Sequence, residues 1–245
     1  MLPFGRVRLK SLVSLFLLGA ASLSASTIFF TASPKEAGGD FISAKADFLV
    51  EAGKLTITLQ NLESHNHTDA QNISGLRFNI GTGITGLAGM TSTGPEISCS
   101  GGSCTDGSIA PTGWGLGTFS GTSIICIVCP VPTAFTVAKS GTPSHTIVGP
   151  DPIAHGSISA GPHNPFVDER ATFVITDSRI SSNLTISSVA FAFGTEAGNW
   201  VAGECEGDSC GGGTRSGGEV PEPLSMALMG GGLLAIGLCG KFRRS

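Results

Sequence analysis

Six of the seven cysteines fall in three local pairs, and their spacing suggests chemistry more directly than any other feature: Cys99/Cys104, Cys126/Cys129 and Cys205/Cys210. The seventh, Cys239, lies in the apolar segment near the C-terminus. An even number of cysteines in an exported chain predicts disulfides, and the four residues inside the first and third pairs allow a turn that brings two Cβ atoms together. A crosslink that closes so short a loop removes little chain entropy. The pairs should therefore staple loops and leave the fold to its hydrophobic core.

The middle pair, Cys126-Ile-Val-Cys129, also resembles a redox motif or half of a zinc site. Redox chemistry needs a thiolate stabilised by a helix N-terminus or a nearby cation, whereas this pair lies in an apolar, strand-like run before Pro130. A zinc ion would need two more ligands, which Cys99 and Cys104 could supply, although the spacing is not that of a known zinc ribbon. A disulfide is the interpretation we favour.

A G-x-S-x-G pattern at residues 207–211, Gly-Asp-Ser-Cys-Gly, could mark a hydrolase. A nucleophile in such a motif needs a strand before it and a helix after it, together with an oriented histidine and carboxylate. Neither element is predicted there, and no motif frames His145, His155 or His163. We therefore predict that the protein is not an enzyme. A secreted hydrolase would require a fold that brings histidine, carboxylate and serine within hydrogen-bond reach.

Two groups of residues carry metal-ligand chemistry. His65 and His67, with Asp69 nearby, could ligate a metal because residues i and i+2 of a strand point the same way, but a polar loop is the simpler interpretation. The second group consists of acidic residues that could bind calcium from loops: Asp168, Glu169, Asp177 and Glu196. No EF-hand or nonapeptide repeat supports calcium binding. We predict neither a metal site nor a cofactor.

Trp114 and Trp200 lie among glycines, and a tryptophan exposed on a β-domain can stack on sugar rings. A role in core packing is at least as common for this residue type. Sequons beginning at Asn66, Asn72 and Asn183 indicate surface exposure of these asparagines. Carbohydrate binding through Trp114 or Trp200 is the second functional hypothesis.

The elements that would position these residues are short strands. Period-2 alternation of apolar residues predicts strands over residues 54–60, 76–80, 171–176 and 186–193. In the first of these, Leu55, Ile57 and Leu59 share one face. Weaker candidates cover residues 41–50, 123–128, 134–138 and 145–148. The glycine-rich middle, residues 81–161, predicts long loops around short strands.

About eight short strands separated by Gly, Pro and Asn turns predict an all-β fold, a single β-sandwich of jelly-roll or immunoglobulin-like type, over residues 27–203. A closed barrel is the alternative. Residues 204–219 are polar and glycine-rich and are predicted to form a flexible linker.

Composition supports many turns and few exposed helices, with 36 glycines and 13% charged residues. The net charge of −4 understates the acidity of the middle of the chain, because basic residues gather at both ends. Residues 27–219 hold 8 Lys and Arg against 17 Asp and Glu, a net charge of −9. An acidic domain of this kind argues against nucleic acid as a partner.

The first 26 residues have the build of a secretory signal peptide. Arg6, Arg8 and Lys10 precede an apolar run over residues 12–25, and small side chains follow near Ala25 and Ser26. As a helix this run would be about 21 Å long, short of a hydrocarbon core of about 30 Å. We predict export through the Sec machinery and removal of residues 1–26 by signal peptidase.

Residues 220–245 form a second segment with the pattern of a targeting signal. The motif Val220, Pro221, Glu222 and Pro223 is followed by an uncharged apolar segment, residues 224–240, and then by a basic tail that contains Lys241, Arg243 and Arg244. The apolar segment is a marginal transmembrane helix of about 26 Å. By the positive-inside rule its basic tail stays in the cytoplasm, with everything before it outside.

A Pro-Glu-Pro motif, a short apolar helix and an Arg-rich end resemble, in this order, the PEP-CTERM sorting signal of Gram-negative bacteria. The resemblance covers about 25 residues at the C-terminus, beside a signal peptide, and only Leu224 departs from the small hydroxyl residues common there. It implies recognition by exosortase, a membrane protease-transpeptidase, and cleavage near Pro221–Pro223. It also implies a species that makes exopolysaccharide.

The first functional hypothesis is therefore a non-enzymatic protein of the cell surface or extracellular matrix with a structural or adhesive role. Its expected partners are Sec, signal peptidase, an exosortase-like protease and, as a candidate, exopolysaccharide. It would be tethered to the inner membrane only transiently.

Overall fold

The computed structural model describes residues 26–37, 40–87, 89–129, 142–152, 156–159 and 161–206. Residues 1–25 of the predicted signal peptide, the predicted strand at 134–138, the Gly-Asp-Ser-Cys-Gly motif and the sorting segment 220–245 lie outside these ranges. No helix of the described residues is long and apolar enough to cross a membrane.

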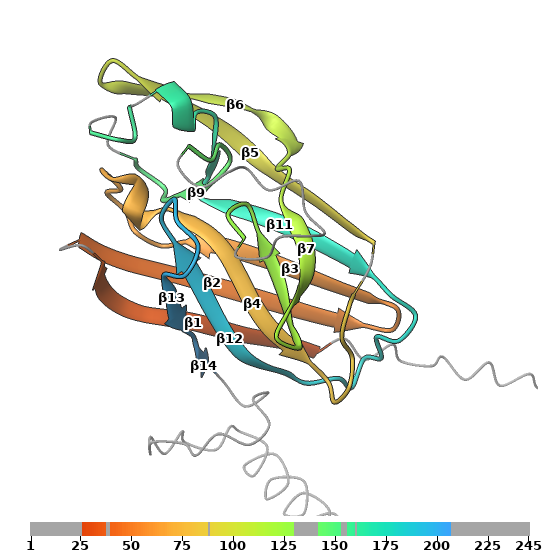
Figure 1. The fold of residues 1–245 in the computed structure, drawn as a ribbon. Helices are drawn as coiled ribbons and strands as arrows, with labels where there is room; N and C mark the ends of the chain where they lie inside the picture. The colour runs from red at the N-terminus through yellow and green to blue at the C-terminus, as the bar shows by residue number, and fades with distance from the viewer. Residues whose placement is uncertain are drawn as a thin grey trace, which may run out of the picture. The chain divides into compact units, whose positions relative to one another are not determined.

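The described residues are almost entirely strands, which confirms the predicted all-β class (Figure 1). In chain order the elements are β1 Ser26–Ala37, β2 Asp40–Glu51, β3 Lys54–Asn61, the 3-10 helix η1 Asp69–Gln71, β4 Ile73–Ile80, β5 Met90–Ser100, β6 Ser103–Pro111, β7 Gly115–Phe119, β8 Thr122–Cys126, β9 Ile147–Val148, the 3-10 helix η2 Gly161–His163, β10 Phe166–Asp168, β11 Arg170–Thr176, β12 Ile186–Phe193, β13 Trp200–Ala202 and β14 Glu204–Glu206.

The strands predicted from alternation are confirmed. β3 alternates buried and half-buried side chains along its whole length, β12 begins and ends where predicted, and β2, β4, β8 and β11 match within a few residues. The strand predicted at 145–148 is reduced to β9, Ile147–Val148. His145 has a φ of 61°, in the left-handed region, so it cannot extend the strand.

Two long strands occupy the region predicted to be loops. β5 and β6 form an antiparallel hairpin. The prediction of long loops around short strands over residues 81–161 is therefore wrong for these two strands. β6 shows no buried face, since Cys104 and Ala110 are its least exposed residues and Ile109 is 76% exposed. Without a buried face a strand carries no alternating apolar signal.

The strands form one hydrogen-bonded sheet that runs in the order β13-β12-β4-β9-β10-β5-β11-β3-β2-β1-β14. Off this path, β6 pairs with β5, β8 pairs with β4, and β7 pairs with β8. β4 and β12 lie across β1 and β2, so the sheet folds over its own inner face (Figure 1). Its two ends, β13 and β14, are consecutive in the chain and separated by Gly203 alone. The chain therefore changes partners at Gly203, as strands do at the corners of packed sheets.

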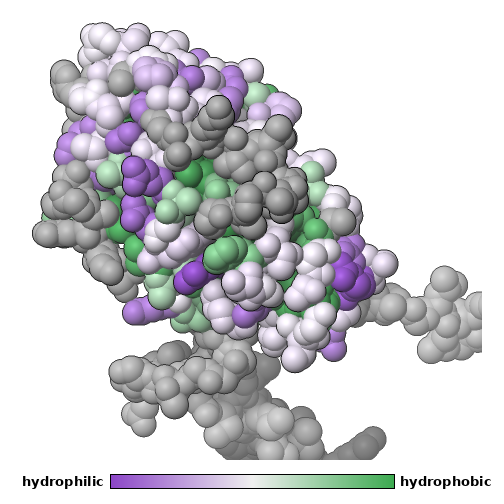
Figure 2. Space-filling view, in the orientation of Figure 1, coloured by the Kyte–Doolittle hydropathy of each residue, from purple (hydrophilic) through white to green (hydrophobic). Residues whose placement is uncertain are grey.

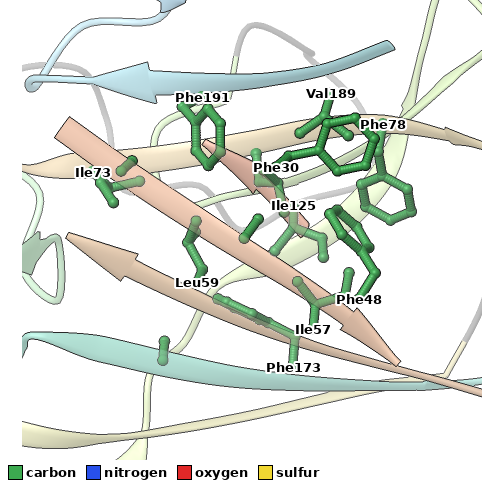
Figure 3. Packing of buried hydrophobic residues seen from close by; sticks show 14 of the residues in the cluster. Phe30, Phe48, Ile57, Leu59, Ile73, Phe78, Ile125, Phe173, Val189 and Phe191 are labelled. Carbon is green, nitrogen blue, oxygen red and sulfur yellow. The ribbon is translucent and has the colours of Figure 1, made fainter. Parts of the chain in front are cut away.

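The core lies between the two halves of the folded sheet. Phe48 of β2 makes edge contacts with Phe30 of β1 and Phe78 of β4, at ring-centroid distances of 5.7 and 5.4 Å (Figure 3). Phe173 of β11 and Phe191 of β12 are also fully buried. A second, smaller cluster around Ile97 and Phe166 lies under the β5–β6 hairpin. Figure 2 shows that much of the visible described surface is pale, neither strongly hydrophilic nor strongly hydrophobic.

The sheet extends into the segment predicted to be a linker. β14, Glu204–Glu206, pairs with β1 through Phe29↔Glu206 and Thr31↔Glu204, and the Thr31 hydroxyl donates to a Glu206 carboxylate oxygen. The sheet therefore includes Glu204–Glu206, three residues past the predicted boundary at residue 203. Two glutamates and a cysteine can form a strand here because their backbone groups complete a ladder that β1 leaves open on that side.

Candidate functional site

Polar side chains gather where the loop after β3, η1, β9 and η2 meet. Asn61, the last residue of β3, donates to the carbonyl oxygens of Gln71 (3.0 Å) and Ile147 (2.9 Å) and accepts from the backbone N–H of Glu63 (3.0 Å). This fully buried amide has all its hydrogen-bonding groups engaged, which offsets its loss of water. It ties the loop 62–72 to the segment that contains β9.

Asn66 and Asn72 continue this network. The Asn66 amide donates to Asn72 Oδ1 (3.0 Å) and accepts from the backbone N–H of Gly149 (2.7 Å), while Asn72 donates to Thr146 Oγ1 (3.1 Å). Both asparagines are fully buried, so the surface exposure indicated by their sequons is wrong. Asn183 is exposed, as its sequon predicted.

A first cluster of serine, histidine and carboxylate lies beside this network. Asp69 Oδ1 accepts from the Ser157 hydroxyl (2.8 Å), and Asp69 Oδ2 lies 3.5 Å from Nε2 of the buried His163. The Ser157 oxygen also accepts from the backbone N–H of Asp69 (2.8 Å). Here the carboxylate stands between serine and histidine, so the histidine cannot take the serine proton. A nucleophilic triad requires the opposite order.

A second cluster has the histidine in the middle. His145 Nε2 lies 3.2 Å from Glu96 Oε1 of β5, and His145 Nδ1 lies 3.1 Å from the Ser144 hydroxyl. The His145 and Glu96 side chains are 23% and 28% exposed, so a small molecule can reach them. Residue 96 is brought to residue 145 because β10 pairs with β5 on one side and with β9 on the other.

Trp114 supports this second cluster from the core. Its indole N–H donates to the carbonyl oxygen of His145 (2.8 Å), and its ring packs on Phe173 with centroids 5.2 Å apart. Trp114 is only 5% exposed, so its prediction as a sugar-stacking platform is wrong. The flanking glycines suggested an open loop, but Trp114 lies between β6 and β7 and turns inward.

Trp200 is half-buried on β13, and the Arg77 guanidinium lies over its ring at 5.1 Å from the centroid. A Cβ placed on Gly75 would lie 3.2 Å from the Trp200 ring, so this glycine gives the indole room to approach β4. A cation over the ring contributes about 0.5–1 kcal/mol at exposed sites. Arg77 therefore covers ring surface that a sugar would need.

The cysteines of the described region are in disulfides, as predicted. Cys99–Cys104 crosslinks β5 to β6, Cys126–Cys129 closes the turn after β8, and Cys205 is disulfide-bonded as well. Its predicted partner, Cys210, lies outside the described residues. Because the first four sulfurs are bonded in pairs, they do not serve as zinc ligands in this structure. Disulfides are typical of proteins that fold in an oxidising compartment.

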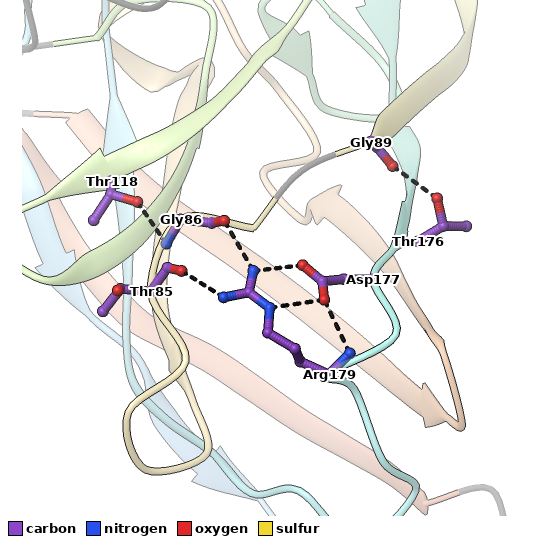
Figure 4. A network of polar contacts seen from close by, with 7 residues as sticks. All are labelled: Thr85, Gly86, Gly89, Thr118, Thr176, Asp177 and Arg179. Carbon is purple, nitrogen blue, oxygen red and sulfur yellow. Dashed lines mark hydrogen bonds and ion pairs between the residues drawn. The ribbon is translucent and has the colours of Figure 1, made fainter.

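The acidic residues considered as calcium ligands do not form a metal site in the described residues. Asp177 is bound by Arg179, whose guanidinium donates to both carboxylate oxygens and to the carbonyls of Thr85 and Gly86 (Figure 4). This contact holds the loop before β5 and raises the pKa of Arg179. Glu196 is exposed between β12 and β13. Among the described residues no three His, Cys, Asp or Glu side chains are placed to hold a metal ion, and His65 and His67 belong to an exposed loop.

Asp168 of β10 is a carboxylate whose pKa is raised by its surroundings. Burial is the main cause, followed by the negative charges of Asp106, Glu169 and Asp151, while Arg170 acts in the opposite direction. Its Oδ1 atom is buried and has no hydrogen-bond partner among the described residues.

Asp168→Asn should therefore stabilise the domain at neutral pH. A folded-state pKa above the unfolded value means that ionised Asp168 opposes folding, and this effect disappears as the pH falls through the folded pKa. We expect the melting temperature to rise by about 1–3 °C at pH 7 and the two proteins to converge below about pH 4. Asp106→Asn should raise the melting temperature by less, because Asp168 stays buried in that variant. A variant less stable than wild type at every pH would show that the carboxylate is well paired.

Three residues named in the sequence analysis lie outside the described residues: His155, Cys210 and the serine of the Gly-Asp-Ser-Cys-Gly motif.

Comparison of the chain with models of protein families, with curated proteins and with solved structures found no match.

Proposed function

We propose that this chain is an exported protein of the bacterial cell surface or extracellular matrix, with a structural or adhesive role in an exopolysaccharide-rich envelope. The Sec machinery and signal peptidase would export it and remove residues 1–26. Residues 220–245 would tether it briefly to the inner membrane, until an exosortase-like protease cleaves near Pro221–Pro223.

The observation that carries this proposal is the crosslinking of a strand-built domain at separate places. Disulfides staple the β5–β6 hairpin and the turn after β8, and Cys205 of the last strand is also bonded. Crosslinks of this kind persist outside the reducing cytosol. They suit a domain that must stay folded where chaperones and ATP are absent.

For the architecture, we propose that the folded sheet is a β-sandwich of the jelly-roll or immunoglobulin-like type. The contact of Phe48 with Phe78 across the core supports two facing layers. Because Trp114 is buried, carbohydrate binding would depend on Trp200. Arg77 already occupies space over the Trp200 ring. No contact in the described residues favours that alternative over a structural role.

Intact mass of the protein recovered from cells tests the sorting route. We expect loss of residues near both Ser26 and Pro223, and a gain of six hydrogens on reduction, for three disulfides. In cells without the exosortase-like protease, and in a Pro221→Ala/Pro223→Ala variant, the C-terminal segment should be retained. A mass that keeps this segment in every strain would make the chain an ordinary membrane-anchored exported protein.

A further inference from the structure

We propose that Ser144, His145 and Glu96 form an acyl-transfer site: Ser144 is the nucleophile, His145 its general base, and Glu96 the positioning residue that orients the imidazole. The site would accept small, accessible acyl esters. It would add a hydrolytic activity to the structural role and would overturn the prediction that the protein is not an enzyme.

The hydrogen bonds assign the protons. Glu96 Oε1, an acceptor, lies 3.2 Å from His145 Nε2, so in the neutral tautomer we assign the hydrogen to Nε2. Nδ1 then has its lone pair free and accepts from the Ser144 hydroxyl 3.1 Å away. The serine proton is therefore aimed at a basic nitrogen whose partner carboxylate can stabilise the imidazolium that forms. This is the division of roles in a serine–histidine–carboxylate triad, with the two ring nitrogens exchanged.

The backbone holds this histidine in an unusual conformation. His145 has a φ of 61°, which β-carbon-bearing residues other than asparagine, aspartate and histidine rarely adopt. Its backbone N–H donates to the Pro165 carbonyl (2.6 Å), and its carbonyl accepts from the Trp114 indole (2.8 Å). Both sides of the residue are thus anchored to the domain.

The Asp69–Ser157–His163 cluster is an internal comparison. It also contains a serine, a histidine and a carboxylate, but its serine donates to the carboxylate and its histidine is 7% exposed. Among the described residues, Ser157 donates to a carboxylate oxygen and not to a basic nitrogen. The two clusters therefore predict opposite reactivities for two serines of one protein.

The reaction uses only the ester and water. Ser144 Oγ attacks the acyl carbon while its proton passes to His145 Nδ1, and the imidazolium then protonates the departing alkoxide, which leaves as alcohol. Water, deprotonated by His145, attacks the acyl-serine, and the proton returns to Ser144 Oγ as the acid leaves. The ester and one water yield one acid and one alcohol, without a change in oxidation state.

A fluorophosphonate probe tests the proposal on the purified full-length protein with its disulfides intact. Ser144 Oγ should displace fluoride from phosphorus, and peptide mass mapping should find the phosphonate adduct on Ser144. Ser144→Ala should abolish this adduct, and Ser157→Ala should leave its rate unchanged. An adduct on Ser209 alone, or none at all under conditions that saturate a serine esterase, would overturn the proposal.

Two variants separate chemistry from folding. His145→Asn keeps a residue that tolerates the left-handed backbone but removes the base, so labelling should fall about 100-fold or more without a change in melting temperature. Glu96→Gln should lower the maximal labelling rate at saturating probe about tenfold and leave the probe's half-saturating concentration unchanged. Labelling of the His145→Asn variant at the wild-type rate would show that Ser144 is not activated by His145.

Discussion

Gly149→Ala should destabilise the domain by on the order of 4 kcal/mol or prevent its folding. A Cβ at this position would lie 1.6 Å from the Glu63 carbonyl oxygen and 2.5 Å from Asn66 Oδ1, well inside any allowed contact. The obstacle is backbone, which cannot rotate away as a side chain would. Relief requires the loop after β3 to separate from the segment 146–149, and that separation breaks the hydrogen bond from Gly149 N–H to Asn66.

Urea unfolding measures this effect, and Gly161→Ala is its control. A Cβ on Gly161 meets no atom within 4 Å, so that variant should stay within about 1 kcal/mol of wild type. Gly149→Ala should lower the urea midpoint strongly without a change in the slope. A Gly149→Ala protein as stable as the control would mean that the asparagine network does not hold the two segments together.

Phe48→Ala should lower the free energy of unfolding by about 3–5 kcal/mol, the usual range when a buried phenylalanine is truncated to alanine. Phe48 is fully buried and contacts Phe30 and Phe78 through their ring edges, so it joins three strands from both halves of the sheet. Truncation removes the ring and leaves a cavity that these two phenylalanines can fill only in part.

The matched control for this variant is Phe119→Ala, because Phe119 is 42% exposed at the end of β7. Its loss should cost less than about 1 kcal/mol. The melting temperatures of the two variants, measured by thermal unfolding, should therefore differ by about 10 °C. Equal losses for the two variants would contradict a core centred between β2 and β4.

Strands with one buried face could be recognised from the sequence. Leu55, Ile57 and Leu59 alternate with threonines because one side of β3 faces the core and the other is half-buried. β5 and β6 gave no such signal: Gly94 and Pro95 interrupt the first, and the second is exposed on both faces. β6 is stabilised by its hydrogen bonds to β5 and not by a buried face. The periodicity of apolar residues cannot detect such pairing.

The candidate site could not be located from the sequence because its members are not neighbours there. Glu96 and His145 are 49 residues apart and meet only through the pairing of β10 with both β5 and β9. Trp114 was singled out by its residue type, yet its position inside the core follows from the turn between β6 and β7. The sequons at Asn66 and Asn72 predict surface residues, because local sequence does not reveal a buried network of amides.

The pairing of β1 with β14 bears on the order of events during folding. The two strands are separated by almost the whole domain, so the outer side of β1 stays unpaired until the last residues of the domain are available. Contacts between such distant segments form slowly because a long loop must close first. For a chain that crosses a membrane from its N-terminus, this delay would keep the domain open, and so able to pass a narrow channel, until translocation reaches Glu206.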